Sequence, residues 1–158
     1  MIYPLVLNAC AELSLSEVKT LVKVDDYEVA EGLYYTKDWM WAKVEDGKVR
    51  VGITDYAQKQ LNEVVFAELP SVGDEVVKDE PFGTVESVKS VSDLTAPVSG
   101  TIEEVNDDVA DSPEMLNDDP YRKGWLVVIS PANLEEDLKT QMDFEASVEW
   151  HKELAKES

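Results

Sequence analysis

The sequence predicts a mainly β domain with peripheral helices, and three observations support this fold class. Short β-branched and aromatic runs recur along the 158 residues, and turn residues separate them. Apolar residues at helical spacing occur in only a few segments. A hydrophobic fraction of 44% supplies one compact core, and a chain of this length has no room for a second catalytic domain.

The first strands are predicted around a tight turn. Residues 40–44 and 48–53 flank Asp46-Gly47, a dipeptide that tolerates the positive φ angles of a type I′ turn. Strand character returns at residues 64–66 and 125–129, which are again β-branched or aromatic. These segments supply the predicted β core.

Helices are predicted at three places. Thr54 is a predicted N-cap for residues 55–63, and Ser112 followed by Pro113 begins a helical turn. The tail carries apolar residues at four-residue steps, which predicts an amphipathic helix that packs on the domain or, as the alternative, binds a partner. The stripe consists of Met142, Ala146, Trp150 and Leu154.

Lys89 is the candidate site residue. It lies between two short apolar runs that we predict to be strands, with Gly83 and Gly100 as breakers at their outer ends. Each glycine is expected either to need a positive φ angle or to lie under close sheet contact. This layout presents one amine at a hairpin tip. Covalent acylation suits such a lysine in an acidic protein, because an amide removes its charge and makes it the root of a tether.

The Lys89 segment and six further blocks resemble, in order, the H-protein of the glycine cleavage system. The blocks are residues 51–58, 64–70, 85–89, 92–94, 96–100, 105–106, and 119–121 with 124–125. In that family the lysine matching Lys89 carries lipoate. The resemblance implies a lipoyl/biotinyl-type barrel-sandwich hybrid, a flattened β-barrel of two similar halves. A faint repeat between residues 72–76 and 105–109 agrees with two halves.

The resemblance also implies a function. Lipoate attached to Lys89 would shuttle the aminomethyl group of glycine from glycine decarboxylase to aminomethyltransferase, and dihydrolipoyl dehydrogenase would reoxidise it. A lipoylating enzyme is the fourth expected partner. The protein itself would be a carrier and not an enzyme, since the chemistry belongs to the cofactor. The alternative is an H-protein-like carrier for another pathway, such as sulfur oxidation or lipoyl transfer.

Two acids near the lysine match family positions and keep two interpretations each. Asp93 either accepts hydrogen bonds from the loaded amine or caps the hairpin turn. Glu86 serves either recognition by the lipoylating enzyme or the solubility of its strand.

One segment departs from the family. Where the family has His-Glu-Trp, this chain has Trp39, Met40 and Trp41. A carboxylate near the loaded arm is therefore lost, unless Asp38 replaces it from two positions away. The two apolar residues alternatively line a groove for a different lipoyl-bound cargo.

The resemblance runs from about Tyr34 to the C-terminal helix. We therefore divide the chain into an N-terminal extension, residues 1–32, and a lipoyl carrier domain, residues 33–158. The extension either adds a strand and a helix to the domain or binds elsewhere. Its Cys10 is interpreted as a small buried hydrophobe rather than a thiol near the lipoyl sulfurs.

The net charge and the cysteine count limit which kinds of partner and which cellular compartment we expect for this protein. A formal net charge of −20, with 14 basic residues against 34 acids, argues against nucleic acid and anionic membranes. The acid excess either steers the protein toward basic clefts or only keeps its surface solvated. One cysteine excludes an internal disulfide, and no leader or membrane-spanning run is seen, so we expect a cytoplasmic protein.

No self-contained catalytic or metal site is predicted. His151 is the only histidine, and we expect it on the surface of the C-terminal helix. The acid pairs 107–108 and 118–119 lack the ligand spacing of a calcium loop, and we interpret them as solvated loop residues.

Overall fold

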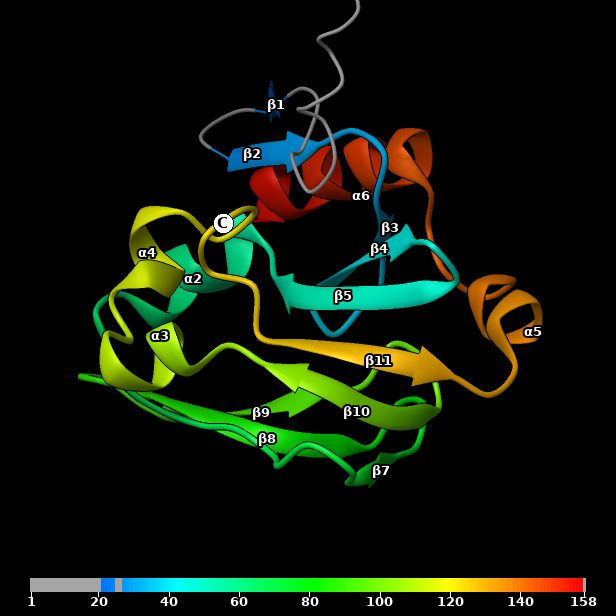
Figure 1. Cartoon of the computed structure of the whole chain (residues 1–158). Coiled ribbons are helices and arrows are strands. Elements are labelled where there is room, and N and C mark those ends of the chain that lie inside the picture. The colour runs from blue at the N-terminus through cyan, green and yellow to red at the C-terminus, as the bar shows by residue number, and fades with distance from the viewer. Residues whose placement is uncertain (1–20, 25–26, 158) are drawn as a thin grey trace, which may run out of the picture.

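The computed structural model describes residues 21–24 and 27–157, which form two packed antiparallel sheets, a separate two-stranded sheet and helices around them (Figure 1). The larger sheet has six strands in the order β3-β4-β5-β11-β10-β7. Its strands are β3 (Tyr34–Tyr35), β4 (Met40–Glu45), β5 (Lys48–Ile53), β11 (Val127–Pro131), β10 (Gly100–Val105) and β7 (Glu75–Val76).

The smaller sheet has the order β6-β8-β9 and carries the candidate lysine between its last two strands. Its strands are β6 (Val64–Glu68), β8 (Pro81–Ser87) and β9 (Val91–Thr95). Inward residues of this sheet, such as Val85 and Leu94, share one apolar cluster with Val51 and Ile129 of the larger sheet. The prediction of a mainly β fold with peripheral helices is confirmed.

Local turn chemistry explains the hairpin that opens the larger sheet. Asp46 and Gly47 have φ angles of 50° and 79°, as a type I′ turn requires, and β4 pairs with β5 in register from Met40↔Ile53 to Glu45↔Lys48. Thr54 caps helix α2 (Asp55–Leu61) by accepting a hydrogen bond from the Ala57 amide. The helix is shorter than predicted because Asn62 takes a left-handed backbone, with φ 64°.

The two glycines near Lys89 lie under close sheet contact, one of the two roles predicted for them, but they are not breakers. Gly83 lies inside β8 and Gly100 begins β10, so neither is a breaker between elements. Neither has a positive φ angle. A Cβ atom at Gly83 would overlap the Glu68 carbonyl oxygen, and one at Gly100 would overlap that of Ser130. Glycine is therefore required for close backbone approach between strands.

The segment after β10 was predicted wrongly in two respects. Residues 107–108 are not loop residues, since Asn106 caps helix α3 (Asp107–Asp111). The next helix, α4 (Met115–Asp118), begins after the predicted turn at Ser112. The faint repeat is also not structural: residues 72–76 lead into β7, whereas residues 105–109 leave β10 and enter α3.

A separate hairpin precedes the larger sheet and packs on its outer side (Figure 1). Strands β1 (Leu21–Val24) and β2 (Tyr27–Ala30) pair antiparallel and contact helix α6 (Phe144–Glu157), while β2 also contacts α2. Val29 and Ala30 share a second apolar cluster with Trp41 and Tyr121. Helix α5 (Leu134–Leu138) connects β11 toward α6. Cys10 lies outside the described residues.

The buried face of α6 differs from the predicted stripe. Ala146 is exposed, whereas Ser147 and His151 are fully buried. A helix turns by about 100° per residue, so strict four-residue steps drift off one face. Met142 and Trp150 of the stripe do pack on the domain as predicted, and Phe144 and Val148 add apolar contacts that the stripe did not include. His151 is buried because the β1–β2 hairpin and α2 enclose this face, so its predicted surface position is wrong.

Candidate attachment site and the adjoining cleft

Lys89 is exposed in the turn between β8 and β9, as the sequence predicted for a hairpin tip. Ser87 holds this turn. Its Oγ accepts hydrogen bonds from the backbone amides of Lys89 and Ser90, each at 3.1 Å, and donates to the Ser90 carbonyl at 3.3 Å. The Ser87 amide also donates to that carbonyl, at 2.8 Å. The backbone under the lysine is therefore fixed while its side chain reaches into solvent.

The tip is also tied to the neighbouring strand. The Val88 amide donates to the Glu63 carbonyl at 3.1 Å, just before β6 begins. Val88 and Val91, on either side of Lys89, are 64% and 62% exposed. The amine therefore stands on an anchored turn, flanked by exposed apolar side chains and open to solvent.

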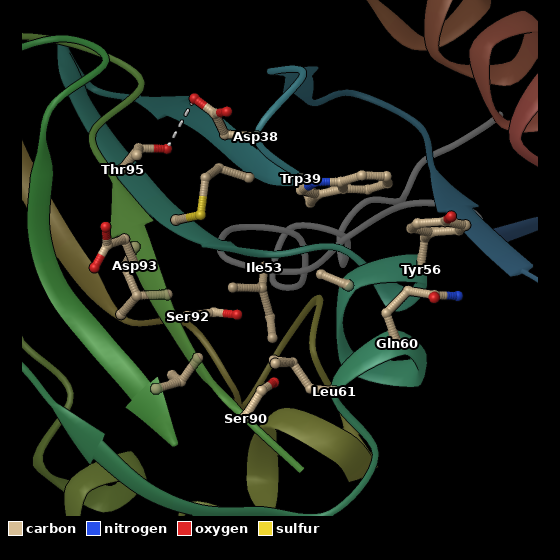
Figure 2. A pocket seen from close by; sticks show the side chains of 14 residues that line it. Asp38, Trp39, Ile53, Tyr56, Gln60, Leu61, Ser90, Ser92, Asp93 and Thr95 are labelled. Carbon is tan, nitrogen blue, oxygen red and sulfur yellow. Dashed lines mark hydrogen bonds between the residues drawn. The ribbon is translucent and has the colours of Figure 1, made fainter. Parts of the chain in front are cut away.

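A cleft of about 570 Å³ opens beside the tip (Figure 2). Ser90 and Ser92, which closely follow Lys89 in the chain, line one side of the cleft. Trp39, in the turn before β4, and Tyr56, in α2, also line it. Its apolar lining residues are Met40, Ile53, Ala57, Leu61, Val85 and Leu94. The cleft thus combines an apolar interior with hydroxyl groups on the side of the lysine.

Two carboxylates line the same cleft. Asp38 accepts a hydrogen bond from the Thr95 hydroxyl at 3.3 Å, which Figure 2 shows as a dashed line, and Asp93 lies on strand β9, two residues before Thr95. Asp93 pairs with Thr84 inside the sheet. It does not cap the turn, because Ser87 makes the turn's hydrogen bonds. Glu86 is exposed on β8, paired with Phe66 and Val91, and does not line the cleft.

Trp39 and Met40, which replace the family's His and Glu, both line the cleft. Met40 is only 1% exposed and belongs to the core, so it offers no charge to the cleft. Trp39 has a φ angle of 70° and stacks on Tyr56, with 4.3 Å between ring centroids and 5° between planes. Trp150 of α6 lies 5.3 Å from the Trp39 ring.

Sequence reasoning missed Ser87, Tyr56 and Thr95 as site residues. Ser87 had a weak signal, since a serine two positions before a turn lysine can accept amide hydrogen bonds locally. Tyr56 and Thr95 reach the cleft only through the packing of α2 and β9. Within residues 21–24 and 27–157, no group of three or more His, Cys, Asp or Glu side chains is arranged to hold a metal ion. No helix in this part of the chain is long and apolar enough to cross a bilayer.

The structure is thus a mainly β domain of packed antiparallel sheets, with an exposed lysine at the tip of the three-stranded sheet. Residues 33–154 match the family model "Glycine cleavage H-protein", and the chain belongs to that family. The crystal structure of a glycine cleavage system H protein from Mycobacterium marinum is similar, with a TM-score of 0.67 and 40% identity. The similarity covers 72% of this chain and 91% of that one.

Curated sequences agree with this assignment. A probable glycine cleavage system H protein of Pyrococcus horikoshii is 55% identical over 135 residues, which cover 85% of this chain and all of the relative. The glycine cleavage system H protein of Bacillus velezensis is 58% identical over 102 residues, 65% of this chain and 80% of the relative. The archaeal match is longer than residues 33–158, so it reaches into the segment before residue 33.

Proposed function

We propose that this protein carries lipoate on Lys89 and shuttles the aminomethyl group of glycine between enzymes of the glycine cleavage system. The observation that carries this proposal is the placement of Lys89, exposed on a turn fixed by Ser87 and adjoining a cleft with two carboxylates. Bound lipoate supplies a disulfide that accepts and releases the cargo. The residues of the chain attach, present and shelter it.

The cleft residues suit a cationic cargo. The aminomethyl group carries an ammonium charge at neutral pH, and Asp38 and Asp93 stand where they could accept its hydrogen bonds. The Thr95 hydroxyl orients Asp38 by donating to it. Apolar lining residues such as Ile53 and Leu94 would exclude water from an arm held in the cleft.

The proposed partners are glycine decarboxylase, aminomethyltransferase, dihydrolipoyl dehydrogenase and a lipoylating enzyme, all acting in the cytoplasm. The protein serves them as a non-catalytic carrier. The net charge of −20 favours partners whose docking surfaces are basic. We assign the carrier role to residues 33–158, with the preceding segment as an addition whose strands β1 and β2 pack on the domain.

The lifetime of the aminomethyl-loaded protein tests this proposal. Glycine labelled at its α carbon and glycine decarboxylase should load the lipoylated protein but not a Lys89→Arg variant. Asp38→Asn, which keeps the size of the side chain and removes its charge, should accelerate loss of the label about fivefold, or 1 kcal/mol, a typical value for one partly solvated charge-assisted hydrogen bond. Glu86→Gln is the matched control, since Glu86 lies outside the cleft.

A second candidate function follows from the apolar wall. Trp39 and Met40 make one side of the cleft apolar, so an apolar lipoyl-bound cargo would also find a complementary surface there. A lipoyl carrier for another pathway, such as sulfur oxidation or lipoyl transfer, fits this observation. Failure of glycine decarboxylase to load lipoylated protein would favour that function, whereas loading with a label lifetime sensitive to Asp38→Asn would exclude it.

A further inference from the structure

Trp39 occupies a backbone conformation that a large side chain rarely adopts. Its φ angle of 70° lies in the left-handed region, where a residue other than glycine is under strain unless its surroundings fix it. Two backbone hydrogen bonds do so: the Trp39 amide donates to the Thr36 carbonyl at 3.2 Å, and the Trp39 carbonyl accepts from the Thr54 amide at 2.9 Å. The result is that an indole stands at the wall of the cleft.

The indole is held in place by a series of ring contacts that ends in the N-terminal hairpin. Trp39 stacks on Tyr56 with 4.3 Å between ring centroids, and Tyr56 meets Tyr27 edge-to-face, with 4.7 Å between centroids and 62° between planes. The Lys59 ammonium lies 5.6 Å from the centre of the Tyr27 ring. Tyr27 begins β2 and is 9% exposed, so its ring is enclosed between the hairpin and α2.

The hairpin is attached to the first turn of α2 by hydrogen bonds as well. The Glu28 amide donates to the Asp55 carboxylate at 2.9 Å. The Tyr121 hydroxyl forms a bridge, since it accepts from the Asp55 amide at 3.2 Å and donates to the Glu28 carbonyl at 2.6 Å. Asp55 directly precedes Tyr56 in the helix. The hairpin therefore fixes both the backbone and the ring of the residue on which Trp39 stacks.

We propose that the β1–β2 hairpin positions the wall of the arm cleft. Tyr27 locks Tyr56, Tyr56 locks Trp39, and the Trp39 indole receives the sulfur end of the arm attached to Lys89. This inference rests on the proposed attachment of lipoate. It makes Trp39 a specificity-determining residue and Tyr27 a positioning residue that does not touch the arm.

The chemistry of the wall fits a sulfur-bearing ligand. Trp39 and Tyr56 line the same cleft as Ser90 and Ser92, which follow Lys89 in the chain, so the cleft leads from the turn of Lys89 to the aromatic pair. Sulfur atoms make favourable contacts with aromatic rings. A disulfide resting on the indole is also less accessible to a thiolate that attacks it.

Tryptophan fluorescence tests the contact, because a disulfide quenches an indole that it touches. Lipoylation of Lys89, verified by intact mass, should lower the emission of the parent protein, and reduction of the arm should restore it. Trp39→Phe should abolish this difference. Trp125→Phe is the matched control, since Trp125 lies over Arg50 outside the cleft, and it should retain the difference.

The rate at which dithiothreitol reduces the arm tests the positioning. Each arm disulfide becomes two thiols as one dithiothreitol becomes its cyclic disulfide. Trp39→Gly, which suits the positive φ angle, should speed reduction about three- to tenfold, the range expected for losing a sulfur–aromatic contact. Tyr27→Leu should speed it about two- to fivefold by loosening the stack, while Tyr27→Phe, which keeps the ring, should match the parent.

The outcomes separate the two proposals. If lipoylation occurs at Lys89 but Trp39→Phe shows the same emission change as the parent, the indole does not contact the arm. If Trp39→Gly speeds reduction and Tyr27→Leu does not, the hairpin does not position the wall. If Tyr27→Leu does not fold, Lys59→Ala replaces it, because that change removes the ammonium group that lies over the Tyr27 ring. A rate of arm reduction equal to that of the parent would then show that the hairpin does not position the wall. Absence of lipoylation at Lys89 would overturn the proposed function and this inference together.

Discussion

Replacing Ser87 with alanine should release the turn that presents Lys89. The change removes an Oγ atom that accepts two backbone amides at 3.1 Å and donates at 3.3 Å to the Ser90 carbonyl. A neutral hydrogen bond contributes about 1 kcal/mol net, and water can reach the exposed amides of Lys89 and Ser90 once the turn opens. We therefore expect a local loss of about 1–2 kcal/mol, with little effect on global unfolding.

Amide hydrogen exchange measures this loss at the two residues concerned. A change of 1–2 kcal/mol corresponds to protection that falls about five- to thirtyfold at Lys89 and Ser90. Ser90→Ala is the matched control, since it removes a hydroxyl from the same turn and leaves the Ser87 hydrogen bonds intact. The rate of lipoylation should fall in Ser87→Ala and not in the control. Unchanged protection in Ser87→Ala would show that its hydroxyl does not hold the turn.

Three other predictions concern stability and docking. Gly100→Ala should lower the free energy of unfolding in urea by about 3 kcal/mol, because the new Cβ would overlap the Ser130 carbonyl and lie 2.9 Å from the Ile129 Cγ2. Gly47→Ala is the control and should add only backbone strain of about 1 kcal/mol. Equal urea midpoints for the two variants would refute the packing argument. Burial lowers the pKa of His151 below its ordinary value of 6.5, so the unfolded chain binds a proton at higher pH than the folded protein. The free energy of unfolding should therefore fall as the pH decreases below 6.5, by at most about 1.4 kcal/mol per pH unit. His151→Gln should flatten this pH dependence, and an unchanged slope would contradict the argument. The association rate constant with each partner enzyme should fall as the salt concentration rises, while the single-turnover rate stays constant. An association rate that does not depend on salt would show that the net charge of −20 does not steer docking.

The parts of the fold that the sequence predicts depend on local chemistry. Asp46-Gly47 specifies its turn through two positive φ angles, and Thr54 specifies a helix start through its own hydroxyl. Lys89 is predicted at a tip because two apolar runs flank it within a few residues. In each case the signal and the structure lie in the same short segment.

The parts that the sequence does not predict depend on contacts between distant segments. His151 is buried because a hairpin more than 100 residues earlier encloses its helix, and its Nδ1 lies 2.8 Å from the Ser147 carbonyl. The cleft likewise joins Asp38, Tyr56 and Asp93 from three separate elements. The left-handed backbone of Trp39 has no sequence signal, because bulky residues disfavour it and only surrounding hydrogen bonds impose it.

The role of Lys89 is tested most directly by peptide mass mapping of protein produced with lipoate and a lipoylating enzyme. We predict a single lipoyl adduct on Lys89, a parent-like melting temperature for Lys89→Arg because the side chain is exposed, and no adduct in that variant. An adduct on Lys78 instead, or an unmodified Lys89 when lipoate is in excess, would contradict the assignment of this turn as the attachment site.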